Sequence, residues 1–313
     1  MFSFFRFIVG SLSFIFINDL SKYKNLDFIL RQEIKNRLYK FPKKIVATKT
    51  HKIFNNKLAD LLLSKKLNSF LRIQFIQKMF FVHNRLFIFR QLRELKASSN
   101  WKLYKKLIVE DNAGNPLRYI FYPISSGNRI NQVYHLHILY KTFQVNFNKI
   151  KNVLEIGGGY GSLARIFSLL NKSIKYIIFD TILVNLLQYY YLRLLNLKIS
   201  FSLKKNFNYS LIHNLKDLKF SNKNYSIDIF IANWSLSEFP LKYRYQFVKF
   251  ILKSKLILIS FQERFENINN LKYFSHLKRK MSKKFIIKII KNDYYFGNYF
   301  EKHNHYYFVA KLR

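Results

Sequence analysis

The sequence contains no cysteine, and it has only 8 glycines and 4 prolines among 313 residues. Without cysteine there can be no disulfide framework, no thiolate metal cluster and no thiolate nucleophile. The lack of disulfides is what an enzyme of the cytoplasm would show, and we expect that location. Half of the residues are apolar, so the chain can bury a substantial core and is not a disordered protein.

Acidic residues are also scarce, with 16 Asp and Glu against 55 Lys and Arg, which gives a formal net charge of +39. Such a chain is attracted to polyanions: nucleic acid, anionic lipid head groups or acidic glycans. The basic residues are spread along the whole chain and form no single arm or stripe. This distribution weakens the case for a dedicated nucleic-acid surface.

The segment from Met1 to Ile17 is an apolar run that is broken by Arg6. This run is shorter than the ~20 apolar residues that cross a bilayer as a helix. No small-residue cleavage site follows it, so a secretory signal is not predicted. We expect it to pack on the core or form a lid, with a shallow anchor at the inner face of the membrane as the alternative.

The first third of the chain shows helical periodicity from Tyr23 to Ser98, with lysines on one side and apolar residues on the other. The stretch Asn112-Ala113-Gly114-Asn115-Pro116 is dense in turn formers and is the clearest break. It predicts a helical N-terminal region at 1–115, as a lid or acceptor-binding part, and a second domain at 116–313. A further loop is expected at Ser125–Asn128, followed by a helix from Asn131 to Phe143. The apolar helical positions are Leu58, Leu61, Leu62, Phe70 and Leu71.

A glycine turn at 157–161 is the strongest local signal. Val153 to Ile156 suits a buried parallel strand, and Ser162 to Leu170 has helical apolar spacing. The intervening glycines leave no Cβ where the backbone must turn sharply and approach a ligand. This pattern predicts a turn that binds a nucleotide cofactor.

Two acidic residues flank this turn. Glu155 precedes it, where an anion would repel a pyrophosphate but suit a cationic amino group and a sulfonium. Asp180 ends the next apolar strand, Ile174 to Asp180, at the distance where ribose hydroxyls are received. The pair favours S-adenosylmethionine, with Glu155 organising the methionine end and Asp180 holding the ribose.

Strands and helices alternate after the turn, which predicts an α/β, doubly wound sheet. A helix is expected over Thr181–Leu195, another begins near Pro240, and the third strand lies somewhere in Ile199–Ile212. Two final strands, Phe285–Ile290 and His305–Ala310, flank a connection that contains Gly297. The remaining predicted strands are Ile227–Ala232 and Leu256–Ser260.

The segment from Val153 to Ala164, the Asp180 strand end and Asn233-Trp234-Ser235-Leu236-Ser237-Glu238 resemble a class I S-adenosylmethionine-dependent methyltransferase. Gly114-Asn115-Pro116 and Tyr134-His135 make the chain similar, more narrowly, to the bacterial sugar O-methyltransferase family. The resemblance implies a Rossmann-like, seven-stranded methyltransferase sheet and a sugar or glycan acceptor. The cofactor-binding residues it implies are Glu155, Gly157, Gly158, Gly159, Tyr160, Gly161, Asp180 and Asn233.

A hydroxyl acceptor is a poor acid, so a base or a metal is expected beside it. Glu238 is one candidate base, with a stabilising carboxylate at a helix N-terminus as its alternative role. His135 is the other candidate, and a half-buried structural histidine is its alternative. His213 is predicted to be structural. His303 and His305 would share a strand face that could hold a metal, but an exposed face is the prediction, and no metal site is predicted.

The sequence therefore predicts an O-methyltransferase that takes a small-molecule or glycan substrate. An RNA methyltransferase is the alternative within enzymes, and a non-catalytic basic module that binds polyanions is the alternative from another class. The loop after the fourth strand lacks the Pro-Pro pair that grips a planar amine, and the chain lacks the cysteine used in pyrimidine carbon methylation. These two absences argue against nucleic acid as the specific partner.

Overall fold

The structure is a computed structural model that describes residues 15–40, 49–80, 85–204, 206–218, 226–292 and 304–313. By contact, the chain divides into two compact units built from interleaved segments. One comprises Met1–Tyr134, Gly159–Ile166 and Thr181–Ile199, and the other His135–Gly158, Phe167–Asp180 and Ser200–Arg313. The domain boundary predicted near residue 115 divides the chain differently from these two units, and it stays a prediction.

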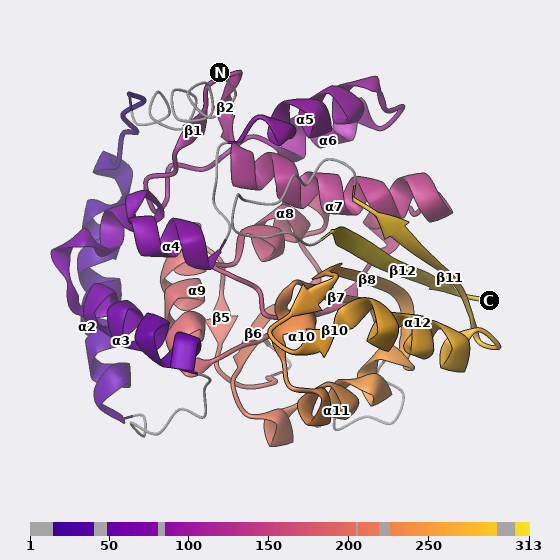
Figure 1. The fold of residues 1–313 in the computed structure, drawn as a ribbon. Helices are drawn as coiled ribbons and strands as arrows, with labels where there is room; N and C mark the ends of the chain where they lie inside the picture. Colours follow the sequence, from indigo (N-terminus) through magenta and orange to yellow (C-terminus); the bar gives the residue numbers. More distant parts are fainter. Residues whose placement is uncertain (1–14, 41–48, 81–84, 205, 219–225, 293–303) are drawn as a thin grey trace. The chain divides into compact units, whose positions relative to one another are not determined.

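The first unit is mainly helical, as predicted (Figure 1). The apolar positions expected on one side of these helices are all buried: Leu58, Leu61, Leu62, Phe70 and Leu71. Burial of this stripe is what stabilises short helices that would not persist alone in water. The helices are η1 (Ser21–Tyr23), α2 (Lys24–Lys40), α3 (Lys49–Leu63), η2 (Lys65–Arg72), α4 (Gln74–Met79), α5 (Phe87–Ala97), α6 (Trp101–Leu107) and α9 (Ile182–Leu194).

The Gly-Asn-Pro turn of this unit has a packing role. Gly114 has a φ of +76°, and a Cβ there would lie 2.3 Å from Cε1 of Phe70. The Asn18 side chain donates to Asn115 Oδ1 at 2.8 Å and to the Pro116 carbonyl at 2.9 Å. Glycine is therefore required by local packing, whatever else the motif does.

The loop predicted at Ser125–Asn128 is wrong. Ser126 ends the hairpin of β1 (Arg118–Tyr119) and β2 (Tyr122–Ser126), and Gly127 already begins α7 (Gly127–Phe143). The hydroxyl of Ser126 accepts the Arg129 amide at 3.0 Å, as an N-cap does. Serine and glycine thus mark the start of a helix here.

The second unit contains the sheet, in the order β11-β12-β8-β7-β3-β4-β6-β5. Strands β3, β4, β6, β7 and β8 pair in parallel, and β12 runs antiparallel to both β8 and β11. This is the predicted doubly wound, Rossmann-like methyltransferase sheet with its antiparallel final hairpin. The strands are β3 (Asn152–Ile156), β4 (Lys175–Phe179), β5 (Ile199–Ser200), β6 (Tyr209–Ile212), β7 (Ile227–Asn233), β8 (Ser254–Gln262), β11 (Phe285–Lys291) and β12 (His305–Leu312).

The sheet has eight strands where seven were predicted, because the two-residue β5 pairs beside β6. The uncertain third strand is β6. Gly297, expected in the final connection, lies outside the described residues.

Helices α11 (Leu241–Ile251) and α12 (Asn270–Met281) cover one face of the sheet through an apolar core that includes Phe247 and Phe274. On the other face, α8 (Ser162–Leu170) packs Phe167 against Tyr176 of β4, with ring centroids 5.5 Å apart. The remaining elements are short: η3 (Phe147–Lys149), η4 (Leu215–Asp217), α10 (Ser235–Glu238), β9 (Arg264–Phe265) and β10 (Ile268–Asn269).

Within the described part of the chain, every helix is too short or too polar to cross a membrane. Most of the apolar run from Met1 to Ile17 lies outside that part.

Candidate active site at the carboxyl edge of the sheet

Strand β3 has β4 on one side and β7 on the other, so the chain order reverses between β3 and β7. In open α/β sheets, ligands bind beyond the carboxyl ends of the strands at such a switch point. The register pairs Glu155 with Ile178 of β4 and with Ile231 of β7. Gly157, Asp180 and Asn233 therefore all come at or just after the ends of adjacent strands.

The glycine turn is held tightly against its neighbours. Gly157 has a φ of +71°, and its amide donates to the Phe179 carbonyl at 2.8 Å. A Cβ on Gly157 would lie 2.2 Å from Cβ of Ser235, whose hydroxyl donates to the Ile156 carbonyl. At Gly158 a Cβ would lie 2.7 Å from Cγ2 of Ile178. The turn thus tolerates no side chain at either position.

Gly157→Ala should lower the free energy of unfolding by about 2–5 kcal/mol, because left-handed strain and a clash with Ser235 add. Gly159→Ala is the matched control: its φ is also positive, at +55°, but the nearest atom to its Cβ is 3.5 Å away. We expect that control to lose only about 1–2 kcal/mol. Denaturant unfolding measures both values, and equal losses would contradict the clash.

Glu155 is buried beneath the turn. The Tyr176 hydroxyl donates to its Oε2 at 2.8 Å. The pKa of Glu155 is raised to about 8, mainly by burial; the hydrogen bond from Tyr176 opposes this rise, and the nearby charge of Asp180 adds to it. At neutral pH the side chain is therefore mostly protonated, whereas the sequence reasoning treated it as an anion. A cationic ligand would restore the charge, because it favours the ionised carboxylate.

Asp180 and Asn233 provide polar groups on either side of the turn. Asp180 is half-buried, and its amide donates to the Ile212 carbonyl at 3.0 Å. Asn233 Oδ1 accepts from the Ser260 hydroxyl at 2.6 Å, while its Nδ2 is buried and has no hydrogen-bond partner among the described residues. A buried donor without a partner at this edge is available to an acceptor atom of a ligand.

In the first unit, Gly159, Tyr160 and Gly161 continue the same loop. The Tyr160 hydroxyl accepts from Asn128 Nδ2 at 2.7 Å, and the ring packs edge-on against Phe70 and Tyr191. The Gly159 carbonyl accepts from Gln188 Nε2 at 2.9 Å. The side chain of Tyr160 thus anchors the loop, and contact of these three residues with a cofactor stays a prediction.

Glu238 is half-buried at the end of α10, immediately after β7. The buried guanidinium of Arg244 donates to the carbonyls on both sides of it, those of Ser237 and Phe239. Arg244 also donates to Asn270 of α12 at 2.7 Å; we call these three contacts of its guanidinium the Arg244 clamp. The backbone that carries Glu238 is therefore held rigidly, as a site residue requires.

His135 lies at the centre of a buried aromatic cluster with Trp234 and Tyr307, at ring centroid distances of 5.2 and 5.5 Å. Its Nδ1 is 2.9 Å from the Tyr307 hydroxyl, and its Nε2 is buried with no partner in the described chain. Burial lowers the pKa of His135 to about 3, so the ring is neutral at physiological pH. If Tyr307 donates to Nδ1, Nε2 carries the proton and acts as a donor to a ligand oxygen.

The prediction of an exposed histidine face on the last strand is wrong for His305. This residue is buried, and its Nδ1 accepts a hydrogen bond from the Trp234 indole at 3.0 Å. His303 lies outside the described residues. His213 is exposed after β6. Among the described residues, no group of three His, Asp or Glu side chains could hold a metal ion.

The sequence reasoning missed Tyr307, Arg244 and the turn at Trp234, which has a φ of +60°. Tyr307 and His135 are 172 positions apart, and nothing in either local pattern indicates that they pair. Arg244 looks like one more surface cation on a lysine-rich helix. The useful signal would have been its place four residues after Pro240, on the inward face of α11.

The strand order and the position of the candidate site at the carboxyl edge define a Rossmann-like methyltransferase fold. No family model matches the chain, and no curated protein matches it. The solved structures that resemble it include the N-methyltransferase NodS from Bradyrhizobium japonicum, solved in complex with S-adenosyl-L-homocysteine (10% identity over 69% of this chain and 99% of that one, TM-score 0.41).

Two others are an rRNA methylase from Streptococcus thermophilus (12% identity, 58% of this chain and 96% of that one, TM-score 0.40) and magnesium protoporphyrin IX methyltransferase from Synechocystis (12% identity, 71% and 98%, TM-score 0.38). TM-scores below 0.5 give no basis for assigning an activity or an acceptor.

Proposed function

We propose that the chain is an S-adenosylmethionine-dependent O-methyltransferase that acts on a sugar or glycan hydroxyl. The observation that carries the proposal is the set of groups at the switch point: the buried Glu155 under a glycine turn, Asp180 after β4, and the unpartnered Asn233 side-chain amide at the end of β7. Carboxyl groups on two adjacent strands suit a ligand with a cationic end and a ribose diol.

Bound S-adenosylmethionine supplies an electrophilic methyl group on a sulfonium. Gly157 and Gly158 let the backbone approach the ligand, because neither position has room for a Cβ. Glu155 faces the cationic methionine end, and Asp180 receives the ribose hydroxyls. Asn233 Nδ2 donates to an acceptor atom of the ligand, since its own Oδ1 is already held by Ser260.

Transfer to a hydroxyl requires a base that takes the proton as the new bond forms. Glu238 takes this role, on a backbone that Arg244 holds from both sides. His135 is a weaker base because burial lowers its pKa to about 3. We assign it instead to positioning, through Nε2, against an oxygen of the acceptor.

Asp180→Ala should weaken binding of S-adenosylmethionine or S-adenosylhomocysteine by about 1–3 kcal/mol, through loss of charge-assisted bonds to the ribose. Asp217→Asn is the matched control, because Asp217 is also an acid at this edge but is exposed on η4 after β6. Titration calorimetry compares the two variants. Unchanged affinity in Asp180→Ala would remove Asp180 from the site, and no binding by the unmodified protein would favour the non-catalytic module.

The acceptor is tested by supplying methyl-labelled cofactor to cell fractions with the purified protein. We expect label in the glycan or glycolipid fraction. The segment at the end of β7, Asn233-Trp234-Ser235-Leu236, lacks the Pro-Pro pair, and the chain has no thiol nucleophile. RNA binding should occur at low salt and fall steeply as salt rises, without methylation. Label in a defined RNA nucleotide would contradict the sugar acceptor and leave the cofactor site standing.

A further inference from the structure

The edge of the sheet opposite the candidate site is where β3, β4, β7, β8 and β11 begin and β12 ends; we call it the amino edge. Exposed lysines stand at the starts of three of these strands: Lys151 before β3, Lys253 before β8, and Lys283 and Lys284 before β11. Residues far apart in the sequence are thus brought to one edge by the topology.

The end of α12 and the chain terminus add to this basic cluster. The last turn of α12 carries the exposed Lys278, Arg279 and Lys280. The Arg313 amide donates to the Lys284 carbonyl at 3.1 Å, which places the C-terminus beside the start of β11 (Figure 1). Sequence reasoning found no basic stripe, because these residues come from separate segments and meet only in the folded sheet.

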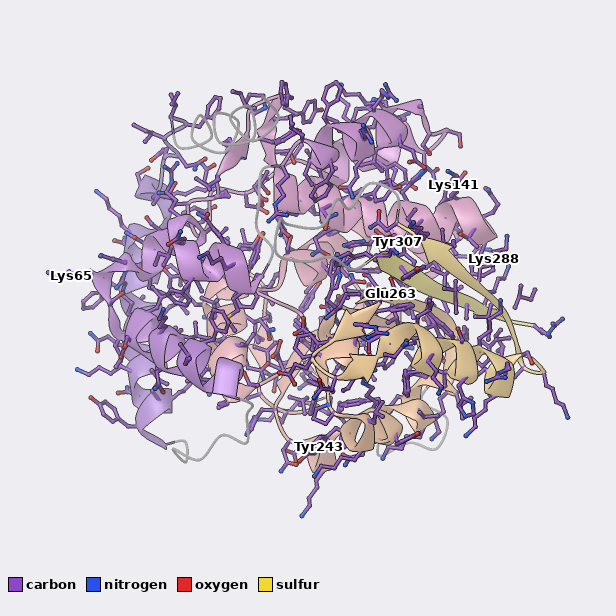
Figure 2. The ribbon with its side chains drawn as sticks, in the orientation of Figure 1. Lys65, Lys141, Tyr243, Glu263, Lys288 and Tyr307 are labelled. Carbon is purple, nitrogen blue, oxygen red and sulfur yellow. The ribbon has the colours of Figure 1, made fainter. Side chains whose placement is uncertain are left out.

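Acidic residues are distributed in the opposite way. Asp228 is the one acid of the amino edge among the described residues of this unit. It is already matched, because it accepts the amides of Lys151 and Asn152 and pairs with Lys255 Nζ at 2.8 Å. The other described acids of the unit lie at or after the carboxyl ends of strands, as Figure 2 shows for Glu263 after β8: Glu155, Asp180, Asp217, Glu238, Glu263 and Glu266.

Compensation of helix dipoles explains only part of the cluster. Lys278, Arg279 and Lys280 sit at the C-terminal end of α12, where cations are favoured. Lys284 Nζ donates to the carbonyl of Leu252, the C-cap residue of α11, at 2.6 Å, so it is also placed at a helix C-terminus. Lys151 and Lys283 precede strands, which have small net dipoles, so no such effect accounts for them. The amino edge therefore carries more positive charge than folding requires.

The chemistry of the edge favours lipid over nucleic acid. Lysine, a point charge, outnumbers arginine, whose planar fork is suited to bases and paired phosphate contacts. The large apolar residues exposed near this edge in the described chain are aliphatic: Leu169, Leu252 and Ile286, at 44%, 37% and 44% exposure. Single-stranded nucleic acid would need exposed aromatic rings for stacking. The exposed tyrosines of α11, Tyr243 and Tyr245, lie in its first half, toward the carboxyl edge.

We propose that the amino edge of the sheet docks on a membrane surface that carries anionic lipid head groups. The lysines contact the head groups, and the exposed aliphatic side chains lie at the interface. The candidate site is at the far end of strands such as β8, whose nine residues span about 30 Å. It therefore stays uncovered when the amino edge is docked. This inference does not depend on the proposed reaction.

Vesicle flotation with the full chain tests the proposal, using phosphatidylcholine with and without phosphatidylglycerol. The edge variant combines Lys278→Gln, Arg279→Gln, Lys280→Gln and Lys283→Gln. The control variant makes the same change in net charge at exposed residues of the carboxyl edge: Lys216→Gln, Lys242→Gln, Arg264→Gln and Lys272→Gln. Thermal unfolding and cofactor titration verify that both variants are folded.

We expect binding only to the anionic vesicles, a loss on the order of 10²–10³-fold in the edge variant, and a much smaller loss in the control. Equal losses of vesicle binding in the two variants would overturn the proposal, because net charge alone would then explain the binding. Equal binding to both vesicle types would also overturn it. So would displacement of the protein from anionic vesicles by single-stranded RNA, if the edge variant also loses RNA binding, because the edge would then be a nucleic-acid surface.

Discussion

Glu238→Gln should lower the rate of methyl transfer by about 10²–10⁴-fold while leaving the affinity for the cofactor nearly unchanged. Glutamine keeps the shape of the side chain but cannot accept the hydroxyl proton as the new bond forms. The backbone should stay in place, because Arg244 holds the carbonyls of Ser237 and Phe239 and not the carboxylate itself. Single-turnover kinetics with labelled cofactor separate this chemical step from binding.

Glu263→Gln is the matched control, since Glu263 is also half-buried and follows the neighbouring strand β8. It should retain most of the activity. Full activity in Glu238→Gln would move the role of base to His135, and His135→Gln would then have to show the loss. Unchanged turnover in both variants would instead leave deprotonation to a divalent metal, and activity should then disappear on chelation.

The pH profile of the reaction bears on the role of His135. A base with a pKa near 3 is already neutral throughout the physiological range, so His135 would give a flat profile there. As a positioning group, His135 should affect KM for the acceptor more than the rate of the chemical step. Tyr307→Phe should produce the same bias, because Tyr307 sets the proton position on the ring through its 2.9 Å contact with Nδ1.

The sheet was predictable because buried parallel strands appear in sequence as short, nearly continuous apolar runs. Val153–Ile156 was extended by one residue in the structure, and the helix Ser162–Leu170 was found with the same bounds. The third strand could be placed only within Ile199–Ile212, because β6, Tyr209–Ile212, is only four residues long and contains a serine. Short runs of this kind have too few residues for periodicity to identify them.

The candidate site was predictable only where local sequence determines it. The glycine turn and Asp180 can be recognised from the residues next to them in the sequence. Their position at the ends of strands follows from the alternation of strands and helices. The Arg244 clamp and the contact of His135 with Tyr307 depend on burial and on pairing across the fold. Neither leaves a local pattern. The predicted charge of Glu155 was wrong for the same reason. Its pKa is set mainly by burial, and burial depends on the tertiary structure.

The free energy of unfolding should fall as pH rises through the range in which Glu155 is protonated only in the folded state. Its pKa is raised from 4.5 to about 8 by burial, so between these values the folded state holds a proton that the unfolded state has lost. Stability then decreases by roughly 1.4 kcal/mol per pH unit from this group. His135 acts with the opposite sign, and its contribution is lost as pH falls from 6.5 toward about 3.

Comparison with Glu155→Gln isolates the contribution of Glu155 to the pH dependence of stability. Relative to this variant, the unmodified protein should lose stability progressively from about pH 4.5 to 8, whereas the contribution of His135 is common to both and cancels. Tyr176→Phe should shift the window upward, because the Tyr176 hydroxyl donates to the carboxyl and lowers its pKa. Denaturant unfolding across pH measures these curves, and parallel curves for the unmodified protein and Glu155→Gln would contradict the raised pKa.

The same carboxyl links cofactor binding to a proton. If the cationic methionine end lies against Glu155, binding at neutral pH should drive its proton off, since an adjacent cation favours the ionised form. Calorimetry in two buffers of different ionisation enthalpy should then show proton release in the unmodified protein, and less of it in Glu155→Gln. Affinity should rise with pH until Glu155 is ionised in the free protein, near pH 8. Equal proton release in the two proteins would mean that Glu155 only supports the turn, with Asp180 and Asn233 left to hold the ligand.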